Sequence, residues 1–431
     1  YFSARLDKQA DAFGTFIREN VQAGQRSVRG VGAGAYLTYK TKDQELITAK
    51  IGLSYTSVEN ARLNREQETE QDQMTFDKAR EASSAIWEDY LGRIRVETSV
   101  KEDKVKFYTG LYHAVLGRGL ASDINGAYPK NDGTVGQIPV KDGKPAFKFY
   151  NTDGIWGGQW NLIQVWALAY PEYLSDYVST HLQVYKDAGW LADGIANSRY
   201  ISGVGTNQLG NVMAAAYQCG IRDFDVETGY AAARKNELEG RNRPLGAGKT
   251  DTDKFVKYGY VPHQDKGSWP DETWMFSASH TLEYSFGAYA VAQMAKALGH
   301  EDDYNTLMHL SKGWERIYNQ ETNLIQPKNE DGSFIKNFDP MQVWRGFQEG
   351  NAYQYTFYVP HDAKSLIAKM GTDESTQRLD SIFIVSQEKM FSGGTEIDAF
   401  SGLQILYNQG NQPCLHIPWL FDEVGRPSLT P

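Results

Sequence analysis

The chain has 431 residues, which is long enough for two or three domain-sized units, and a net charge of −10 at pH 7. A surface that follows a phosphate backbone needs clustered cations, and the sequence contains no block of Lys and Arg, so we expect no nucleic-acid partner. No run of about 18 apolar residues occurs, so the sequence predicts no membrane span.

The chain begins with YFSARLDKQA, which contains neither an initiator Met nor the charged and apolar segments of a signal peptide. We therefore expect a fragment or a processed chain. Two cysteines, Cys219 and Cys414, lie far apart in the sequence. They could form one bridge, but two thiols do not make a zinc site and nothing forces them together, so we expect two buried free thiols.

The first sixty residues predict β-structure. Residues 35–41 and 45–56 alternate apolar with polar side chains, the KDQ sequence between them suits a turn, and residues 29–35 are rich in glycine. Two or three strands cannot bury a sheet face by themselves. The segment is therefore either the end of a larger β-domain or a small flap on the rest of the chain.

The period changes to that of a helix after about residue 70. Residues 73–94 place Phe76, Ile86, Tyr90 and Ile94 at helical spacing. Further helical patterns cover 104–117, 159–169, 172–188, 207–219, 226–237, 277–298, 301–317, 360–370, 373–384 and 412–421. Roughly ten helices without a short repeat fit either a toroid of helical hairpins or an irregular bundle. In a toroid, the site would lie where the inner helices and loops converge.

One acidic residue stands among many rings in the sequence WRGFQEGNAYQYTFYVPHD, residues 344–362. Glu349 lies between Phe347 and Tyr353, where its ionised form would lose solvation. Its pKa would then rise, and it could hold a proton near neutral pH, as the general acid for a glycosidic oxygen must. The alternative is a glutamate that caps a helix or bonds to the backbone at Gly350 and Asn351.

Three other segments carry candidate residues. Glu283 lies near the start of a helical pattern that continues with the small-residue stripe Ala288, Val291, Ala292 and Ala295. Residues 408–423 supply amide oxygens that suit Ca²⁺, although Asn and Gln are also ordinary turn residues. Trp156 and Trp160 flank two glycines, either as a platform for a sugar or as a plug for the base of a helical barrel. Residues 197–211 are glycine-spaced but match no phosphate-binding signature.

These pieces resemble glycoside hydrolase family 92, the calcium-dependent exo-α-mannosidases. The similar segments run in family order over nearly the whole chain and include SASHTLEY, EGNAYQYTFYVPHD and QGNQPCLHIPWLFDEVGRP. The resemblance implies a mainly α fold, a helical toroid of the (α/α)6 type preceded by the end of a β-supersandwich. Residues 1–60 would be the last strands of the sandwich, 61–100 a linker helix and 101–431 the catalytic domain, with the chain truncated at both ends.

The resemblance also implies roles for individual residues. Glu349 matches the general acid of an inverting reaction, and a base Asp would stand roughly 6.5–9.5 Å away. Gln409 and Asn411 would lie near Ca²⁺. The residues implied to bind the glycan are Trp156, Trp160, Glu283, Asn351, Gln354 and His416.

Two departures from the family pattern affect this reading. The family's base lies downstream of HIP, in a motif that would fall after Pro431. Where typical members have Trp-Asp-x-x-Arg, this chain has Trp156, Gly157, Gly158, Gln159 and Trp160, so the acid and the arginine are replaced. A related α-glycosidic linkage is then an alternative to α-mannose.

Three functional readings follow from these observations. The first is an exo-glycosidase of the α-mannosidase type that is secreted or periplasmic. The second is a non-catalytic glycan-binding homologue that lacks the base, and the third is a structural helical toroid without a sugar site.

Overall fold

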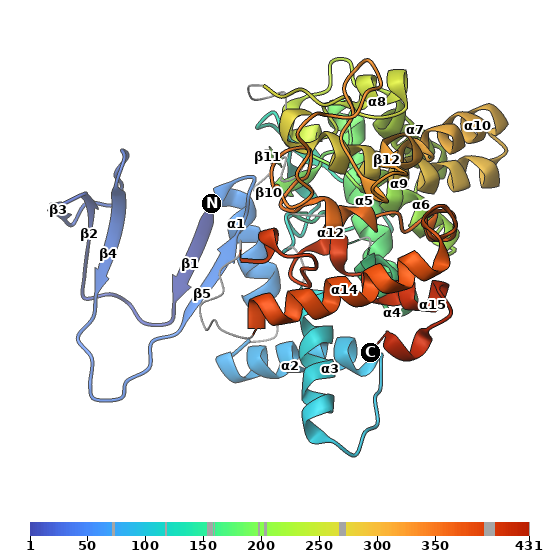
Figure 1. Cartoon of the computed structure of the whole chain (residues 1–431). Helices are drawn as coiled ribbons and strands as arrows, with labels where there is room; N and C mark the ends of the chain where they lie inside the picture. Colours follow the sequence, from blue (N-terminus) through green and yellow to red (C-terminus); the bar gives the residue numbers. More distant parts are fainter. Residues whose placement is uncertain are drawn as a thin grey trace. The chain divides into compact units, whose positions relative to one another are not determined.

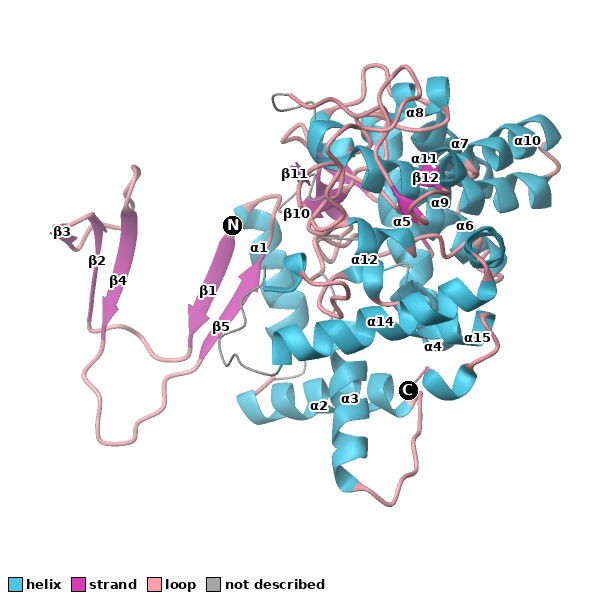
Figure 2. Cartoon of the chain, in the orientation of Figure 1, coloured by secondary structure: helices cyan, strands magenta, loops and turns pink. Residues whose placement is uncertain are grey.

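The computed structural model describes residues 1–70, 74–116, 119–152, 158, 160–196, 199–201, 205–266, 273–391 and 401–430. The described part of the chain is mainly helical, and its strands form small sheets of two or three strands (Figures 1 and 2). None of the helices searched there is both long and apolar enough to cross a membrane. The chain divides into two compact units, which we describe separately.

The first unit comprises Tyr1–Val115, Ala121–Pro129 and Val135–Ala146. Two antiparallel sheets open it, one with the order β1-β5 and one with the order β3-β2-β4. Its first five strands are β1 (Phe2–Leu6), β2 (Ala12–Ile17), β3 (Asn20–Ala23), β4 (Ala33–Thr38) and β5 (Ala49–Leu53). The other elements are α1 (Val58–Arg65), the π-helix η1 (Glu66–Glu70), α2 (Phe76–Gly92), most of α3 (Lys101–Leu116), β6 (Ala127–Pro129), β7 (Val135–Gln137), β8 (Val140–Lys141) and β9 (Lys144–Pro145).

A buried carboxylate ties α1 to a loop in this unit. Asp123 accepts hydrogen bonds from Ser54 Oγ at 3.0 Å, from Thr56 Oγ1 and from Asn64 Nδ2 at 2.8 Å. The backbone N–H of Ile124 donates back to Asn64 Oδ1 at 3.0 Å. Because a buried charge is tolerated only when its lone pairs are satisfied, these donors explain how an acid can lie in this interior.

The second unit comprises Leu116–Leu120, Lys130–Thr134 and Phe147–Pro431. Its longer helices are α4 (Leu162–Ala169), α5 (Pro171–Ala188), α6 (Leu209–Gln218), α7 (Val226–Leu238), α9 (Thr273–Leu298), α10 (Glu301–Leu310), α13 (Ala363–Met370) and α14 (Thr372–Phe391). Shorter elements are β10 (Gly194–Ala196), β11 (Arg199–Ile201), η4 (Leu245–Ala247), α8 (Thr252–Tyr258), α11 (Gly313–Ile317), β12 (Tyr318–Asn319), β13 (Leu324–Ile325) and α12 (Ala352–Thr356). The 3₁₀ turns are η5 (Ser401–Gln404), η6 (Gln412–Cys414), η7 (Ile417–Trp419) and η8 (Pro427–Leu429), with α15 (Leu420–Glu423) between the last two.

Local signals set several of these helix ends. The Thr75 side chain accepts a hydrogen bond from Lys78 N at the start of α2, and Asp225 does the same for Thr228 N at the start of α7. Pro171 occupies the first turn of α5, and Gly189 ends that helix in the left-handed region with φ 76°. These features confirm the helices predicted over 73–94, 172–188 and 226–237.

Two expectations from the sequence are wrong. The helix predicted over 412–421 is instead two 3₁₀ turns and the four-residue α15, because Pro413 and Pro418 cannot donate the backbone bonds that a continuous helix needs. Both cysteines are free, as expected, but only Cys414 is buried. Cys219 follows the last turn of α6 and is exposed, because the apolar face of that helix ends before it.

The aromatic run in 344–362 lies in the core of the second unit. Phe347, Tyr355, Phe357 and Tyr358 are all buried in one cluster with Trp314 and residues of α13 and α15. The rings of this segment therefore support a packed interior, and the acid among them lies at its edge.

Candidate active site

Glu349 lies on a tight loop that ends at α12. Gly346 and Glu349 both have positive φ, 88° and 49°, and a non-glycine residue in this region is strained. Neighbouring side chains hold the loop in place. Ser279 Oγ accepts from Gln348 N at 3.1 Å, and Tyr355 Oη donates to the Gln348 carbonyl at 2.6 Å. The backbone around Glu349 is therefore fixed from two sides.

The Glu349 side chain is partly exposed at the edge of the aromatic core. Asn411 Nδ2 donates to the backbone carbonyl of Glu349 at 2.7 Å. This hydrogen bond involves the main chain of Glu349 and not its carboxylate. Among the described residues, no lysine or arginine lies within ion-pair distance of this carboxylate. Burial raises the pKa of Tyr355 well above its usual value, as does the nearby Glu283 charge, so this phenol remains a hydrogen-bond donor to the loop.

Asn351 and Gln354 are both buried and hold a second loop. The Asn351 side chain caps α12 by accepting from Tyr353 N at 3.0 Å, and its Nδ2 donates to the carbonyls of Leu403 and Ile405. Gln354 Nε2 donates to the carbonyls of Gly402 and Ile405, both at 2.8 Å. In this structure both amides connect the Glu349 segment to residues 402–405. That Asn351 and Gln354 contact a glycan stays a prediction.

Trp160 and His416, which are far apart in sequence, stack on each other. Their ring centroids are 5.0 Å apart with an interplanar angle of 10°. Tyr358 closes the group, with its ring 5.3 Å from Trp160 and 6.0 Å from His416. His416 Nε2 lies 2.6 Å from the Phe357 carbonyl, and burial lowers the pKa of His416 to about 4, so the ring is neutral near pH 7 and donates this bond. Trp156 lies outside the described residues.

Glu283 is buried on α9, where 3 % of its surface is exposed. Its Oε2 accepts from Tyr358 Oη at 2.6 Å and from Gln208 Nε2, and Asn211 Nδ2 donates in turn to the side-chain oxygen Oε1 of Gln208. Burial raises the pKa of Glu283 to about 7. Gln208 was not predicted as a site residue; it comes just before α6, in the glycine-spaced segment 197–211 that matches no phosphate-binding signature. The one sequence feature that could have indicated it is a glutamine at the start of a predicted helix.

The loop with Gln409 and Asn411 fits part of a calcium shell. It offers neutral amide oxygens beside the Glu349 backbone, and Tyr407 Oη donates to Gln409 Oε1. Ca²⁺ takes six to eight oxygens and usually includes carboxylates. Among the described residues, no group of three or more His, Cys, Asp or Glu side chains is arranged to hold a metal. This loop alone therefore supplies a minority of the ligands that the ion needs.

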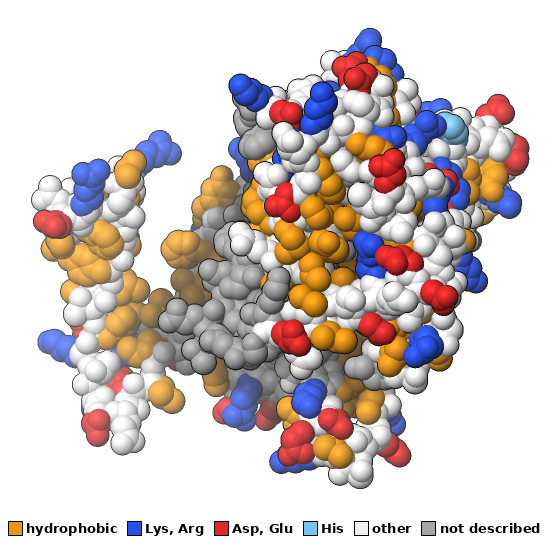
Figure 3. All heavy atoms as spheres, viewed as in Figure 1, with side chains coloured by type: hydrophobic (Ala, Val, Ile, Leu, Met, Phe, Trp, Pro, Cys, Tyr) orange, Lys and Arg blue, Asp and Glu red, His pale blue; other side chains and the backbone are white. Residues whose placement is uncertain are grey.

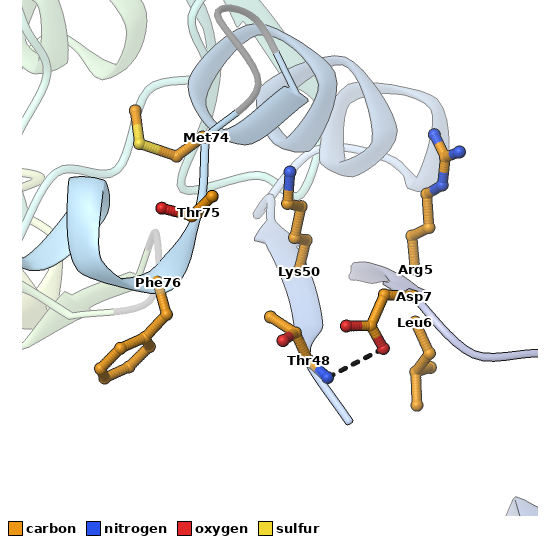
Figure 4. Close-up of a pocket in the computed structure, with 8 residues that line it drawn as sticks. All are labelled: Arg5, Leu6, Asp7, Thr48, Lys50, Met74, Thr75 and Phe76. Atoms are coloured by element: carbon orange, nitrogen blue, oxygen red, sulfur yellow. Dashed lines mark hydrogen bonds between the residues drawn. The ribbon is translucent and has the colours of Figure 1, made fainter. Parts of the chain in front are cut away.

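A cavity of about 580 Å³ lies in the first unit, between β1, β5 and the start of α2 (Figure 4). Arg5, Asp7 and Lys50 give it a mixed charge, and Asp7 Oδ1 accepts from Thr48 N at 3.0 Å. A second cavity of about 390 Å³ shares Lys50 and Phe76 with the first and is more apolar. Neither cavity is lined by a residue that the sequence analysis proposed for the site. On the face that Figure 3 displays, positive and negative side chains are interspersed, without a continuous basic surface.

Comparisons with known proteins show the family of the chain. The profile of the glycosyl hydrolase family 92 catalytic domain matches residues 60–431. A curated protein from Arthroderma benhamiae, described as an uncharacterized secreted glycosidase, is 24 % identical over 93 % of this chain and 48 % of its own length. The chain thus spans about half the length of this relative.

Solved structures match over almost the whole chain. A family 92 α-mannosidase from Bacteroides thetaiotaomicron is 24 % identical with a TM-score of 0.80, covering 100 % of this chain and 54 % of its own. An inverting mannosidase of the same family and organism is 23 % identical with a TM-score of 0.83, covering 98 % of this chain and 56 % of its own. These matches confirm the expected mainly helical fold class, and with the profile match they show that the chain belongs to glycosyl hydrolase family 92.

Proposed function

We propose that the protein is an inverting exo-glycosidase that hydrolyses terminal α-mannosyl or related α-glycosyl linkages, with Glu349 as the general acid. The observation that carries the proposal is the Glu349 loop. A strained backbone, held by Ser279, Tyr355 and Asn411, presents a partly exposed carboxylate at the edge of an aromatic core. Strain of this kind persists where the surroundings enforce it, and it is concentrated at functional sites.

The proposed chemistry is a single displacement. Glu349 donates its proton to the glycosidic oxygen as the bond from that oxygen to the anomeric carbon breaks. A base carboxylate takes a proton from the water that attacks the opposite face of the anomeric carbon. Trp160 and His416, stacked and partly exposed, would contact the apolar face of the sugar. The solved neighbours are described as mannosidases, which favours a mannosyl group as the first substrate to test.

We further propose that Gln409 and Asn411 contribute neutral oxygens to a Ca²⁺ site. When bound, the ion would grip sugar hydroxyls as a Lewis acid. Full-length enzyme that keeps its activity and its melting temperature after chelation would exclude this part of the proposal. We also propose a secreted or periplasmic location, in line with the description of the fungal relative as secreted.

The test of the acid uses the full-length gene product and two substrates. Glu349→Gln should lower the rate on an unactivated mannosyl disaccharide by about 10²- to 10⁴-fold. The loss should be much smaller on a dinitrophenyl α-mannoside, whose leaving group needs no proton. The matched control is Glu321→Gln, which changes an exposed acid in a turn of the same unit. A Glu349→Gln enzyme that cleaves the disaccharide at the wild-type rate would exclude Glu349 as the acid.

The same assay distinguishes the alternative of a non-catalytic glycan-binding protein. The replacement of the motif's acid and arginine by Gly157 and Trp160 bears instead on which sugar is recognised, so a related α-glycosidic linkage should be tested beside the mannoside. Full-length protein that binds mannoimidazole by calorimetry but releases no sugar from either substrate would support the non-catalytic alternative. Active protein should release the β-anomer first, which proton NMR detects before mutarotation.

A further inference from the structure

Glu283 connects two segments that are each 75 residues away in the sequence. Its Oε2 accepts from Gln208 Nε2 and from Tyr358 Oη. The Gln208 amide is itself oriented by Asn211, which donates to its carbonyl oxygen, so the two donors converge on one carboxylate oxygen. An acceptor that is buried and shared in this way fixes the groups around it, because neither donor can turn away without losing a buried bond.

Tyr358 transmits this constraint to the aromatic rings of the proposed site. It is completely buried, so it cannot itself contact a sugar. Its ring, however, packs 5.3 Å from Trp160 and 6.0 Å from His416, and these two rings are partly exposed. We call Tyr358, Trp160 and His416 the aromatic cluster. The orientation of the Tyr358 ring therefore sets the buried surface against which the Trp160 and His416 rings pack.

A second branch leads from the same tyrosine to the proposed acid. Tyr355 packs edge-on against Tyr358, with ring centroids 6.1 Å apart and an angle of 82°. Its hydroxyl donates to the carbonyl of Gln348, the residue before Glu349. A displaced Tyr358 ring would thus disturb both the sugar-facing rings and the loop of the acid.

We propose that Glu283 is a positioning residue that holds Tyr358 and, through it, the aromatic cluster that receives the sugar. The proposal rests on the proposed function of the site. It assigns Glu283 a role through Tyr358 in place of direct contact with the glycan. Only 3 % of Glu283 is exposed, and its Oε2 already accepts from two protein donors.

The test is a mutant cycle on the full-length protein with an aryl α-mannoside. Glu283→Met keeps the shape of the side chain but removes the acceptor, and Tyr358→Phe removes the donor. Each should raise KM by roughly ten- to hundredfold, within the range for leaving a buried hydrogen-bonding group unsatisfied. With a dinitrophenyl leaving group, which needs no proton from Glu349, kcat should stay within about threefold of wild type. The double variant should be no worse than the worse single variant, because both changes break the same link.

Two controls separate positioning from general damage to the fold. Glu283→Gln retains a carbonyl acceptor for both donors and should stay within about threefold of the wild-type KM. Tyr304→Phe removes a tyrosine hydroxyl on α10 and should leave KM unchanged. Mannoimidazole affinity, measured by calorimetry, should follow KM in every variant.

The outcomes are distinct. Wild-type KM in Glu283→Met and Tyr358→Phe, or losses that multiply in the double variant, would overturn the inference while leaving the role of Glu349 intact. If Glu283→Met does not fold, Tyr358→Phe decides alone, since Gln208 still donates to Glu283 in that variant. Wild-type protein that neither hydrolyses the mannoside nor binds mannoimidazole would overturn the mannosyl form of the proposed function, and this inference with it.

Discussion

A buried ion pair joins α7 to the loop between η4 and α8 in the second unit, and breaking it should strongly destabilise that unit. Lys249 Nζ donates to Glu237 Oε2, and only 1 % and 2 % of the two side chains are exposed. Glu237 lies on α7, and Lys249 lies between η4 and α8. Glycines of α6 and α9 close over the carboxylate: a Cβ on Gly210 or on Gly287 would come within 2.5 Å of its oxygens.

The size of the loss in stability follows from the charge that stays buried when one partner of the pair is removed. Lys249→Met leaves the Glu237 carboxylate buried without its cation, because only 2 % of that side chain is exposed and the two glycines pack against it. Removing one partner of a buried pair costs about 3–5 kcal/mol, whereas replacing both partners with apolar groups is often neutral or stabilising. For a unit of this size the single change should lower the Tm by roughly 5–8 °C. The double variant Lys249→Met/Glu237→Leu should recover most of that loss.

The loss in the free energy of unfolding can be measured by urea titration monitored by far-UV circular dichroism, because most of the helical signal arises in the second unit. Tryptophan fluorescence provides a second probe of the same transition. The matched control is Lys186→Met, which breaks the exposed pair of Lys186 with Asp225 and should cost less than about 1 kcal/mol. A Lys249→Met protein as stable as the control would refute the reasoning. So would a double variant that is as unstable as Lys249→Met.

Three further predictions concern stability, reactivity and pH. Gly346→Ala should destabilise the protein by about 2 kcal/mol more than Gly299→Ala in urea unfolding. Both glycines have φ above 80°, but only at Gly346 would the added Cβ meet another residue, a proline carbon 2.4 Å away. A thiol reagent should label Cys219, which is exposed, and spare Cys414, because burial raises the pKa of the Cys414 thiol to about 12. Mass spectrometry measures the ratio of labelling at the two cysteines. Burial raises the pKa of Glu283 from 4.5 to about 7, so between these pH values the folded protein holds a proton that the unfolded chain has released. The free energy of unfolding should therefore fall by about 3 kcal/mol as the pH rises from 4.5 to 7, and Glu283→Gln should flatten this slope.

The helices were predictable where the signal is local. A capping threonine, a proline in the first turn and a terminal glycine all act within a few residues, so α2 and α5 follow from the sequence. The 412–421 segment has helical spacing of its apolar residues, and its two prolines override that spacing. The spacing of apolar residues therefore predicted a helix correctly only where no proline removed a backbone hydrogen-bond donor.

The site was predictable as a set of residues but not as an arrangement. Glu349 and Asn411 could be singled out from their motifs, whereas the bond from Asn411 to the Glu349 carbonyl crosses 62 residues and has no sequence signature. The partners of Glu283 are equally remote. Side-chain pairs of this kind depend on how the helices pack, and a single sequence carries no record of which distant residues meet.

Helix α9 shows how one element can serve both the core and the proposed site. Its second half carries the small-residue stripe that the sequence indicated, Ala288, Val291, Ala292 and Ala295, and all four are buried. Small side chains allow close approach, and this half of the chain's longest described helix packs with α6 and α10. The stripe therefore explains the packing but not why the first half of the same helix is polar and buried.

The polar first half of α9 satisfies the backbone and side chains of surrounding loops. Thr281 Oγ1 accepts from Val261 N at 2.9 Å, Ser279 Oγ accepts from Gln348 N, and His280 Nδ1 lies 2.9 Å from Asp251 Oδ2. Loops carry unpaired backbone groups, and buried ones must find partners. Polar residues at successive positions of a buried helix therefore mark it as a scaffold for loops. Ser279→Ala and Glu283→Met, which remove acceptors for the segments of the proposed site, should consequently change both stability and KM, whereas substitutions in the small-residue stripe should change stability alone.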